Sequence, residues 1–258
     1  MKYLSLIILF GCLPCSNTFA QQPDLDELNH INYITDPSKP KVIGSGDVVE
    51  ETRKIDMSFG ELTVGNGMQL YIIPDSSNNI LIAAQAAILS LVSSEVTDSS
   101  LTIRLTASLE TYKGIKLYVP IGRLSKITIK EGGYLHFPST ISAVDKLNLL
   151  LQSGALADCN INSGDFSCTV MGGATLNLDG NAKKTAQIAV KGGSVLNGKK
   201  FKCTRCNVTV LGASKCTLSV QEVLNARVEN ESSLVYFGNP KIESKTTKLN
   251  GKIRHKVF

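Results

Sequence analysis

The stretch MGGATLNL, residues 171–178, returns along the chain as KGGSVLNG at 191–198 and as LGASKCTL at 211–218. In each copy, small residues precede a run in which apolar and polar side chains alternate, which is the period of a β-strand. The pattern continues in both directions along the sequence. The six predicted corner positions are Gly133, Gly154, Gly173, Gly193, Ala213 and Ser233, spaced by 21, 19, 20, 20 and 20 residues.

A constant period near 20 residues predicts stacked structural repeats. The leucine and asparagine spacing of a leucine-rich repeat is absent. We therefore predict an all-β fold, a right-handed parallel β-helix (a β-solenoid) in which equivalent strands of successive coils pair at about 4.8 Å. Leu176, Leu178, Ile188 and Val190 would then point into a continuous core, and the small corner residues would allow φ values that larger residues resist.

The first twenty residues predict a signal peptide. Lys2 precedes the apolar run YLSLIILFGCLPC, and SNTFA supplies small residues for cleavage before Gln21. The apolar run is too short to span a bilayer, and no transmembrane segment is expected in the mature chain. We expect export to the periplasm, the outer-membrane surface or the medium. An alternative is a lipid anchor at Cys12 or Cys15, because LFGC at 9–12 weakly resembles a lipoprotein box.

Composition indicates the domain organisation and argues against one class of partner. Residues 21–43 are polar and broken by prolines, which indicates an arm or linker. The net charge of +5 is spread along the chain without a long basic block, so nucleic acid is not an expected partner. The β-helix domain is expected over 44–254, followed by a tail at 255–258.

The chain resembles a known family, the head GIN domain of the "putative auto-transporter adhesin" proteins, which are exported by Bacteroidetes-type bacteria. The matching segments are GSGDVVEETRKI (44–55), FGELTVGNGMQLYII (59–73), SSLTIRL (99–105), LYVPIGRLSKITIKEGG (117–133), SSLVYFGNPKI (232–242) and LNGKI (249–253). The order of these segments carries the resemblance. It implies a surface or envelope β-solenoid, and it supports the fold far more than any function.

Five cysteines in the mature part depart from the usual look of that family, as does the lysine-rich segment at 241–256. Cys203 and Cys206 form C-x-x-C, but their neighbours indicate a strand and a corner, whereas a redox motif is expected at a helix N-terminus. Structural disulfides or stacked buried thiols are the favoured interpretation for an exported protein. The candidate disulfides are Cys159 with Cys168 and Cys206 with Cys216, and one of the five cysteines must stay unpaired.

No motif for catalysis or for a cofactor is found. His30, His136 and His255 have no recurring serine, cysteine or carboxylate partner. Neither a G-x-S-x-G nor an H-E-x-x-H sequence occurs, and neither does a phosphate-binding loop. We predict no catalytic residue, no cofactor and no metal site.

Two charged sets leave alternatives open. Asp145 with Asp165, and Asp158 with Asp179, are 20 and 21 residues apart, so two acidic ladders of the kind used by polysaccharide-cleaving β-helix enzymes are conceivable. Local turn capping is the favoured interpretation of these aspartates. The second set, a basic surface for an anionic partner, would comprise Lys183, Lys184, Lys191, Lys199, Lys200, Lys202 and Arg205.

The sequence thus predicts a non-enzymatic envelope or surface β-helix that binds surface glycans or envelope proteins. A polysaccharide-binding or polysaccharide-cleaving β-helix is one alternative, and a self-assembling structural rod is the other. Function is expected on outward residues that vary between copies, such as Asn177 and Asp179, and not on the repeated core positions.

Overall fold

The computed structural model describes residues 41–55, 59–75, 77–122 and 124–257. The predicted signal peptide, which contains Cys12 and Cys15, lies outside the described residues. Residues 21–40 of the predicted arm, which include His30, also lie outside them. Within the described chain, no helix is long and apolar enough to cross a membrane.

The described chain is built almost entirely of β-strands, hydrogen-bonded into one continuous sheet. In chain order the elements are β1 (Val48–Lys54), β2 (Glu61–Val64), β3 (Gln69–Ile73), β4 (Asn79–Gln85), α1 (Ala86–Leu89), β5 (Val92–Thr97), β6 (Ser100–Leu105), β7 (Lys116–Pro120), β8 (Lys126–Ile129), β9 (Tyr134–His136), β10 (Ile141–Leu151), β11 (Leu156–Met171), β12 (Thr175–Lys191), β13 (Val195–Leu211), β14 (Lys215–Glu229), β15 (Ser233–Phe237), β16 (Lys241–Lys248) and β17 (Lys252–Lys256).

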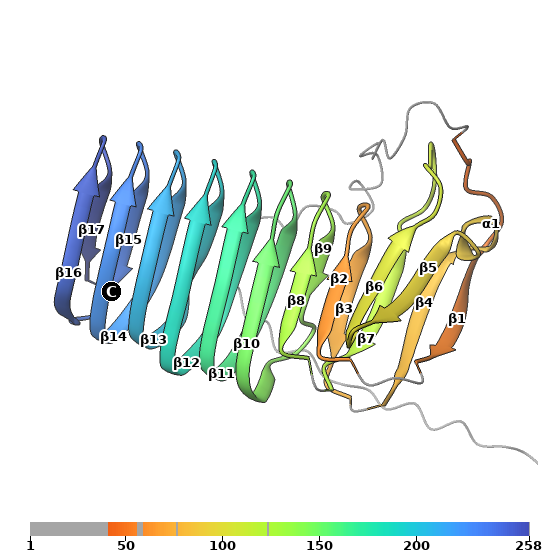
Figure 1. Ribbon diagram of the computed structural model, residues 1–258, viewed down its shortest axis with the longest axis horizontal. Helices are drawn as coiled ribbons and strands as arrows, with labels where there is room; N and C mark the ends of the chain where they lie inside the picture. Colours follow the sequence, from red (N-terminus) through yellow and green to blue (C-terminus); the bar gives the residue numbers. More distant parts are fainter. Residues whose placement is uncertain (1–40, 56–58, 76, 123, 258) are drawn as a thin grey trace, which may run out of the picture.

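These strands wind into a parallel β-solenoid, as the 20-residue repeat predicted (Figure 1). Strands β11 to β14 each bend midway, so that one strand supplies two sides of a coil. We call the side formed by the first halves face B and the side formed by the second halves face A. The bends lie along the arc edge, and the tight turns between coils lie along the corner edge. The chain climbs face A, crosses the corner edge and descends face B as it advances, which gives the right-handed winding usual for parallel strands.

The spatial order of the coils departs from the chain order near the N-terminus. β2 pairs in parallel with both β6 and β8, and β3 pairs with both β7 and β9. The coil made by β2 and β3 is therefore inserted between two coils that come later in the sequence. As a result, side chains from three distant segments become neighbours on the rod surface.

The corner edge is made by pairs of consecutive residues with positive φ, the conformation of a type I′ turn. Gly172–Gly173 and Gly192–Gly193 are two such pairs, and at the third pair Ala213 has φ +58°. Four of the six predicted corner positions, including Gly154, have positive φ.

The remaining two corner positions need correction. The left-handed pair is Glu131–Gly132 where Gly133 was expected, and Asn230–Glu231 where Ser233 was expected. The small residues at 133 and 233 follow the turn, and Ser233 already belongs to β15. The coil that ends at Glu231 is shorter than the one before it, and the coil that starts at Gly132 is longer than the one after it, so a marker placed by residue size and constant spacing misses both turns.

The core consists of stacked inward rows. Leu176 pairs in register with Leu196, which pairs with Cys216, which in turn pairs with Leu234. All four predicted inward residues of the β12 coil (Leu176, Leu178, Ile188 and Val190) are buried. Because burial of one such aliphatic side chain contributes about 1.5–3 kcal/mol, every coil depends on its neighbours for stability.

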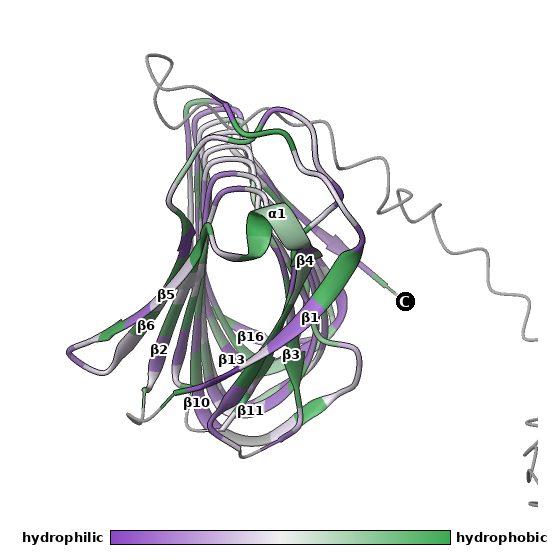
Figure 2. Ribbon diagram, turned by 90° about the vertical axis from the view of Figure 1, so that its right-hand side faces the viewer, coloured by the Kyte–Doolittle hydropathy of each residue, from purple (hydrophilic) through white to green (hydrophobic). Residues whose placement is uncertain are grey.

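The two ends of the rod differ. At the N-terminal end, β4 runs antiparallel to both β7 and β1, and α1 covers the opening of the core (Figure 2). Gln85 is buried there, and its side-chain oxygen accepts a 2.7 Å hydrogen bond from the Lys113 backbone N–H. At the C-terminal end, inward positions become polar. Thr247 pairs in register with the inward Val228 of the preceding coil, and His255 stacks on Tyr236.

Candidate functional site

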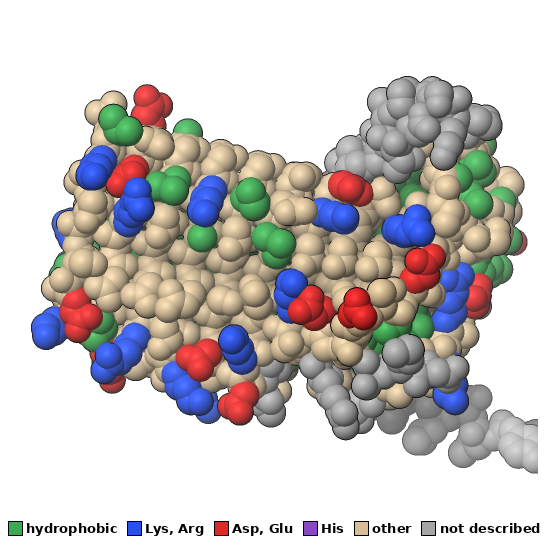
Figure 3. Space-filling view, in the orientation of Figure 1, with side chains coloured by type: hydrophobic (Ala, Val, Ile, Leu, Met, Phe, Trp, Pro, Cys, Tyr) green, Lys and Arg blue, Asp and Glu red, His purple; other side chains and the backbone are tan. Residues whose placement is uncertain are grey.

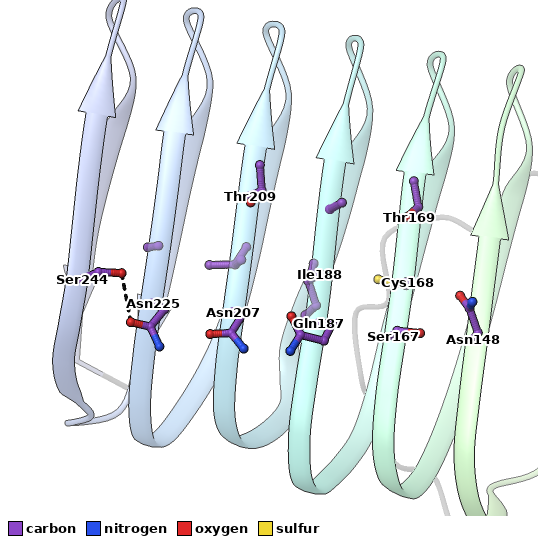
Figure 4. Close-up of a pocket in the computed structure, with 13 residues that line it drawn as sticks. Asn148, Ser167, Cys168, Thr169, Gln187, Ile188, Asn207, Thr209, Asn225 and Ser244 are labelled. Atoms are coloured by element: carbon purple, nitrogen blue, oxygen red, sulfur yellow. Dashed lines mark hydrogen bonds between the residues drawn. The ribbon is translucent and has the colours of Figure 1, made fainter.

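A shallow groove of about 410 Å³ crosses face A, perpendicular to the strands (Figure 4). Two outward rows line it. One consists of Thr169, Ala189 and Thr209, and the other holds one residue from each successive coil in strict register. We call this row the amide band; it comprises Asn148, Ser167, Gln187, Asn207, Asn225 and Ser244. Outward and inward residues alternate along each strand, so the buried side chains beneath the band belong to the core.

The amide band carries no formal charge. None of the residues that line the groove is acidic or basic. Figure 3 shows this as a strip across the middle of β10 to β14 that is free of Lys, Arg, Asp and Glu. On the arc side of the band, Lys146, Asp165 and Arg205 each lie two residues before a band residue. In the row on the corner side, Arg227 bonds to Glu229 with an Nε–Oε1 distance of 3.0 Å. This hydrogen bond lowers the pKa of Glu229, which keeps the pair ionised and its net charge near zero.

Most hydrogen-bonding capacity in the band is unused by the protein. The side chains of Asn148, Gln187 and Asn207 have no hydrogen-bond partner among the described residues. At the C-terminal end of the band, Ser244 donates a 2.9 Å bond to Asn225, the bond drawn in Figure 4. An amide with both a free donor and a free acceptor is a ready partner for a polar ligand.

Face B carries the opposite arrangement. Its outward row is also in register, but Asn177 donates to Asp158 at 2.7 Å and Asn197 donates to Asn177 at 2.9 Å. Asp158 also accepts a 2.6 Å bond from the Tyr134 hydroxyl. The amides of face B therefore bind one another, and their role is to hold successive coils together.

The same face B row contains an aromatic cluster that the sequence did not reveal. Tyr71 stacks on Tyr118 with ring centroids 5.0 Å apart, and His136 packs edge-on against Tyr71 at 5.7 Å. The cluster joins rings from β3, β7 and β9, which are far apart in the sequence. The insertion of β3 between β7 and β9 creates it, and nothing in the linear order of these residues signals that insertion.

Tyr134, next to this cluster, is held protonated. Burial raises the pKa of the Tyr134 phenol, and the hydrogen bond to Asp158 raises it further. A phenol with a raised pKa is a poor general base but a dependable hydrogen-bond donor. Since His136 Nδ1 lies 3.4 Å from the same hydroxyl, the group is saturated by its own protein neighbours.

The five cysteines of the described chain are buried free thiols. The structure therefore contradicts both candidate disulfides, Cys159 with Cys168 and Cys206 with Cys216. Cys159 and Cys168 lie on opposite faces of one coil, whereas Cys206 and Cys216 lie on opposite faces of neighbouring coils. All four occupy inward positions. Burial raises the pKa of each of these four thiols, and for Cys206 a hydrogen bond with Cys203 is the larger cause.

The conceivable acidic ladders do not form. Asp165 pairs in register with Lys146 and not with Asp145. Asp158 pairs with Asn177, two residues before Asp179. A one-residue offset sends side chains to opposite faces of a strand and a two-residue offset sends them to neighbouring rows, so similar sequence spacing did not ensure stacking. Among the described residues, no three His, Cys, Asp or Glu side chains are grouped so as to hold a metal ion.

The remaining candidates are spread over the surface. Of the histidines that the structure describes, His136 lies on face B, and Nε2 of His255 donates a 2.7 Å hydrogen bond to the Gly238 carbonyl oxygen. The predicted basic surface is divided: Lys191 lies at the corner edge, and the others lie near the arc edge of two adjacent coils. All members of that set are exposed: Lys183, Lys184, Lys191, Lys199, Lys200, Lys202 and Arg205.

Comparison with known proteins places this rod in a family. The family described as "Putative auto-transporter adhesin, head GIN domain" matches residues 58–240. The chain belongs to this family. A search of curated proteins gave no match.

Several solved structures share the fold of this chain. A "putative adhesin" from Bacteroides fragilis aligns with a TM-score of 0.75 at 19% identity, over 83% of this chain and 100% of that one. A "putative adhesin" from Parabacteroides merdae aligns at 0.66 and 16% identity, over 84% and 99%. A "Putative lipid binding protein" from Parabacteroides distasonis aligns at 0.63 and 15% identity, over 84% and 100%. At these identities the likeness shows the fold alone.

Proposed function

We propose that this head GIN protein is an exported, non-enzymatic adhesin that binds its partner through the amide band of face A. The observation that carries the proposal is the contrast between the two faces. Asn148, Gln187 and Asn207 keep their amides free, whereas Asn177 and Asn197 bond within their own row. A long, rigid row of free amides supports recognition by many weak contacts along the rod.

Export is the second part of the proposal. It is supported by the sequence of residues 1–20 and by the family, whose description names auto-transporter adhesins. Mass spectrometry of the mature protein tests it: we expect a chain that begins at Gln21. A chain that begins at a lipidated Cys12 or Cys15 would replace soluble export by anchoring, and an intact Met1 in the mature protein would contradict export.

The absence of catalysis is supported by the arrangement of the titratable groups on the two faces. The groove on face A has no acid or base in its lining. On face B, the carboxylate of Asp158 and the phenol of Tyr134 bond to each other, at 2.6 Å. A polysaccharide-cleaving enzyme needs a carboxyl pair that faces one substrate bond, and the register separates the four aspartates considered for that role.

An adhesion assay with matched surface variants tests the main proposal. Beads coated with the protein are scored for attachment to epithelial cell layers and to bacterial cell surfaces. Thr209→Arg places a long cationic side chain in the groove of face A, and we expect it to abolish most attachment. Thr217→Arg makes the same change at an outward strand position of face B, beside Asn197, and we expect attachment to persist.

The two threonines are a matched pair, because both are half-buried, lie in the middle of a coil and pair on both sides. Thermal melting of both variants checks that the rod is intact. Equal attachment by the two variants, or a loss confined to Thr217→Arg, would contradict recognition by face A.

A further inference from the structure

The lining of the amide band also restricts the chemistry of its ligand, and this inference rests on the proposed function. We propose that the band binds a neutral, linear polysaccharide whose chain lies along the rod axis, across the strands. The residues that make the contacts are Asn148, Ser167, Gln187 and Asn207.

Electrostatics favour a neutral ligand. A charged ligand that leaves water at a protein surface needs an opposite charge or a dense set of donors to replace its hydration. The groove offers neither a cation nor an anion, and the neighbouring Arg227 is already bonded to Glu229. On the other side of the band the nearest cations are Lys146 and Arg205, each two residues before a band residue, and neither lines the groove.

The floor of the groove does not suit a lipid chain. Acyl chains bind where apolar side chains are accessible, as in enclosed apolar pockets. Here the apolar residues beneath the band, such as Ile188 and Val208, are 3% and 2% exposed and face the core. The groove is open to solvent and its accessible rim is amide and hydroxyl.

An extended peptide is also disfavoured. A peptide that adds to a sheet needs a free strand edge, because it binds through main-chain hydrogen bonds. Strands β11, β12 and β13 are paired on both sides throughout face A, so their backbone groups are occupied. Only side chains remain available for binding in the middle of the band.

The geometry of the row suits a linear polymer of sugars. Successive coils repeat at about 4.8 Å, so the row from Asn148 to Asn207 spans roughly 14 Å and the full band to Ser244 roughly 24 Å. The row is straight, and each rung offers one side chain that both donates and accepts. Sugar hydroxyls also donate and accept, which makes amides and hydroxyls their natural partners. A chain laid along the axis would meet equivalent groups at each rung.

Affinity electrophoresis with soluble polysaccharides tests this inference. The probes are a mannan, a β-glucan and a galactan as neutral chains, hyaluronan as a charged chain, and phosphatidylcholine vesicles for lipid. We expect retardation by at least one neutral chain, with affinity that rises with the length of oligosaccharides cut from it. Affinity should change less than about twofold between low and high salt, because no ion pair is formed.

Two variants with a matched control localise the binding. The double substitution Gln187→Ala with Asn207→Ala removes two ligand contacts, and we expect affinity to fall by about tenfold or more. Asn207→Asp keeps the shape but introduces a charge, and should weaken binding by a similar factor. Asn197→Ala removes an amide of face B and should leave affinity unchanged, with thermal melting as the check on folding.

The outcomes separate this inference from the proposed function. If Thr209→Arg abolishes attachment but no neutral polysaccharide binds, the ligand class is wrong and the adhesin proposal stands. Retention of the protein by hyaluronan or by the vesicles that depends on Gln187 and Asn207 would overturn the assignment to a neutral polysaccharide. Neutral chains that bind equally to the double variant would overturn both the assignment to the band and the role of face A.

Discussion

At the scale of single residues, the backbone of the coils separates two kinds of glycine. Gly180 has φ +104°, and a Cβ built on it would collide with the backbone of Ile161 in the preceding coil. Gly173 has φ +77°, but a Cβ there would meet nothing within 4 Å. Both positions disfavour an L side chain, whereas only Gly180 also lacks space.

We therefore expect Gly173→Ala to lower the free energy of unfolding by about 1–2 kcal/mol, the cost of a left-handed alanine. Ala213, at φ +58° in an equivalent turn, shows that the rod accepts this residue there. Gly180→Ala should cost clearly more, because the neighbouring strand must move. Urea denaturation of the two variants measures the difference, and equal costs would contradict the steric explanation.

The buried thiols give a second prediction at the residue scale, on pH. The folded state raises the pKa of Cys159, Cys168, Cys206 and Cys216, so above about pH 8.5 the unfolded chain loses thiol protons that the folded chain keeps. Fewer protons are bound in the unfolded state, so the free energy of unfolding falls as pH rises. The expected slope is up to about 1.4 kcal/mol per pH unit for each thiol.

Urea denaturation between about pH 8 and about pH 10 measures this slope, since the ordinary thiol pKa lies in that range. Cys216→Ala removes one thiol from the core and should make the slope shallower, although it lowers stability overall. An unchanged slope would mean that the thiols ionise in the folded state. Full reaction of the native protein with a thiol reagent would also contradict the prediction, because buried thiols are protected from such reagents.

At the scale of strands and rows, identical residue types have different roles on the two faces. Asn177 links Asp158 to Asn197, so Asn177→Ala removes two hydrogen bonds and should cost about 1 kcal/mol of stability. Gln187→Ala removes no hydrogen bond and should change stability by less than about 0.5 kcal/mol. Chemical denaturation of both variants tests this contrast, and a larger cost for Gln187→Ala would show that the band is structural.

Some features of the strand arrangement were predictable from the sequence, and others were not. The period-two alternation of MGGATLNL identified β12 and its inward leucines, because burial of one face leaves a strong local signal. The insertion of β3 between β7 and β9 leaves no such signal, since pairing between distant segments is a tertiary property. A functional role was expected for the outward residue Asn177, but its amide bonds to Asp158 and Asn197 within the outward row of face B. The free amides of Gln187 and Asn207 could be recognised as one row only from the strand register that the structure shows.

At the scale of the whole molecule, the ends of a solenoid decide whether rods stay separate. β16 pairs only with β14, and β17 pairs only with β15, so the outer edge of the last described coil has free backbone groups. Such an edge invites pairing with another chain unless charge prevents it. The edge carries Lys241, Lys245, Lys248, Lys252, Arg254 and Lys256, all exposed. Lys245 occupies an inward position, because it pairs in register with the buried Ala226 of the preceding coil.

We expect these lysines to prevent the end-to-end stacking that a structural rod would use. Replacing Lys245 and Lys252 by isoleucine keeps the backbone edge and removes two charges from it, so association should rise with concentration in light scattering. Lys191→Ile with Lys215→Ile makes the same chemical change at two exposed strand residues that already pair with a neighbouring strand on both sides. Association of both variants to the same extent would mean that added apolar surface, and not the open edge, drives it. Stacking by the unaltered protein would show instead that the lysines do not guard the edge, and would favour an assembling rod over separate adhesive rods.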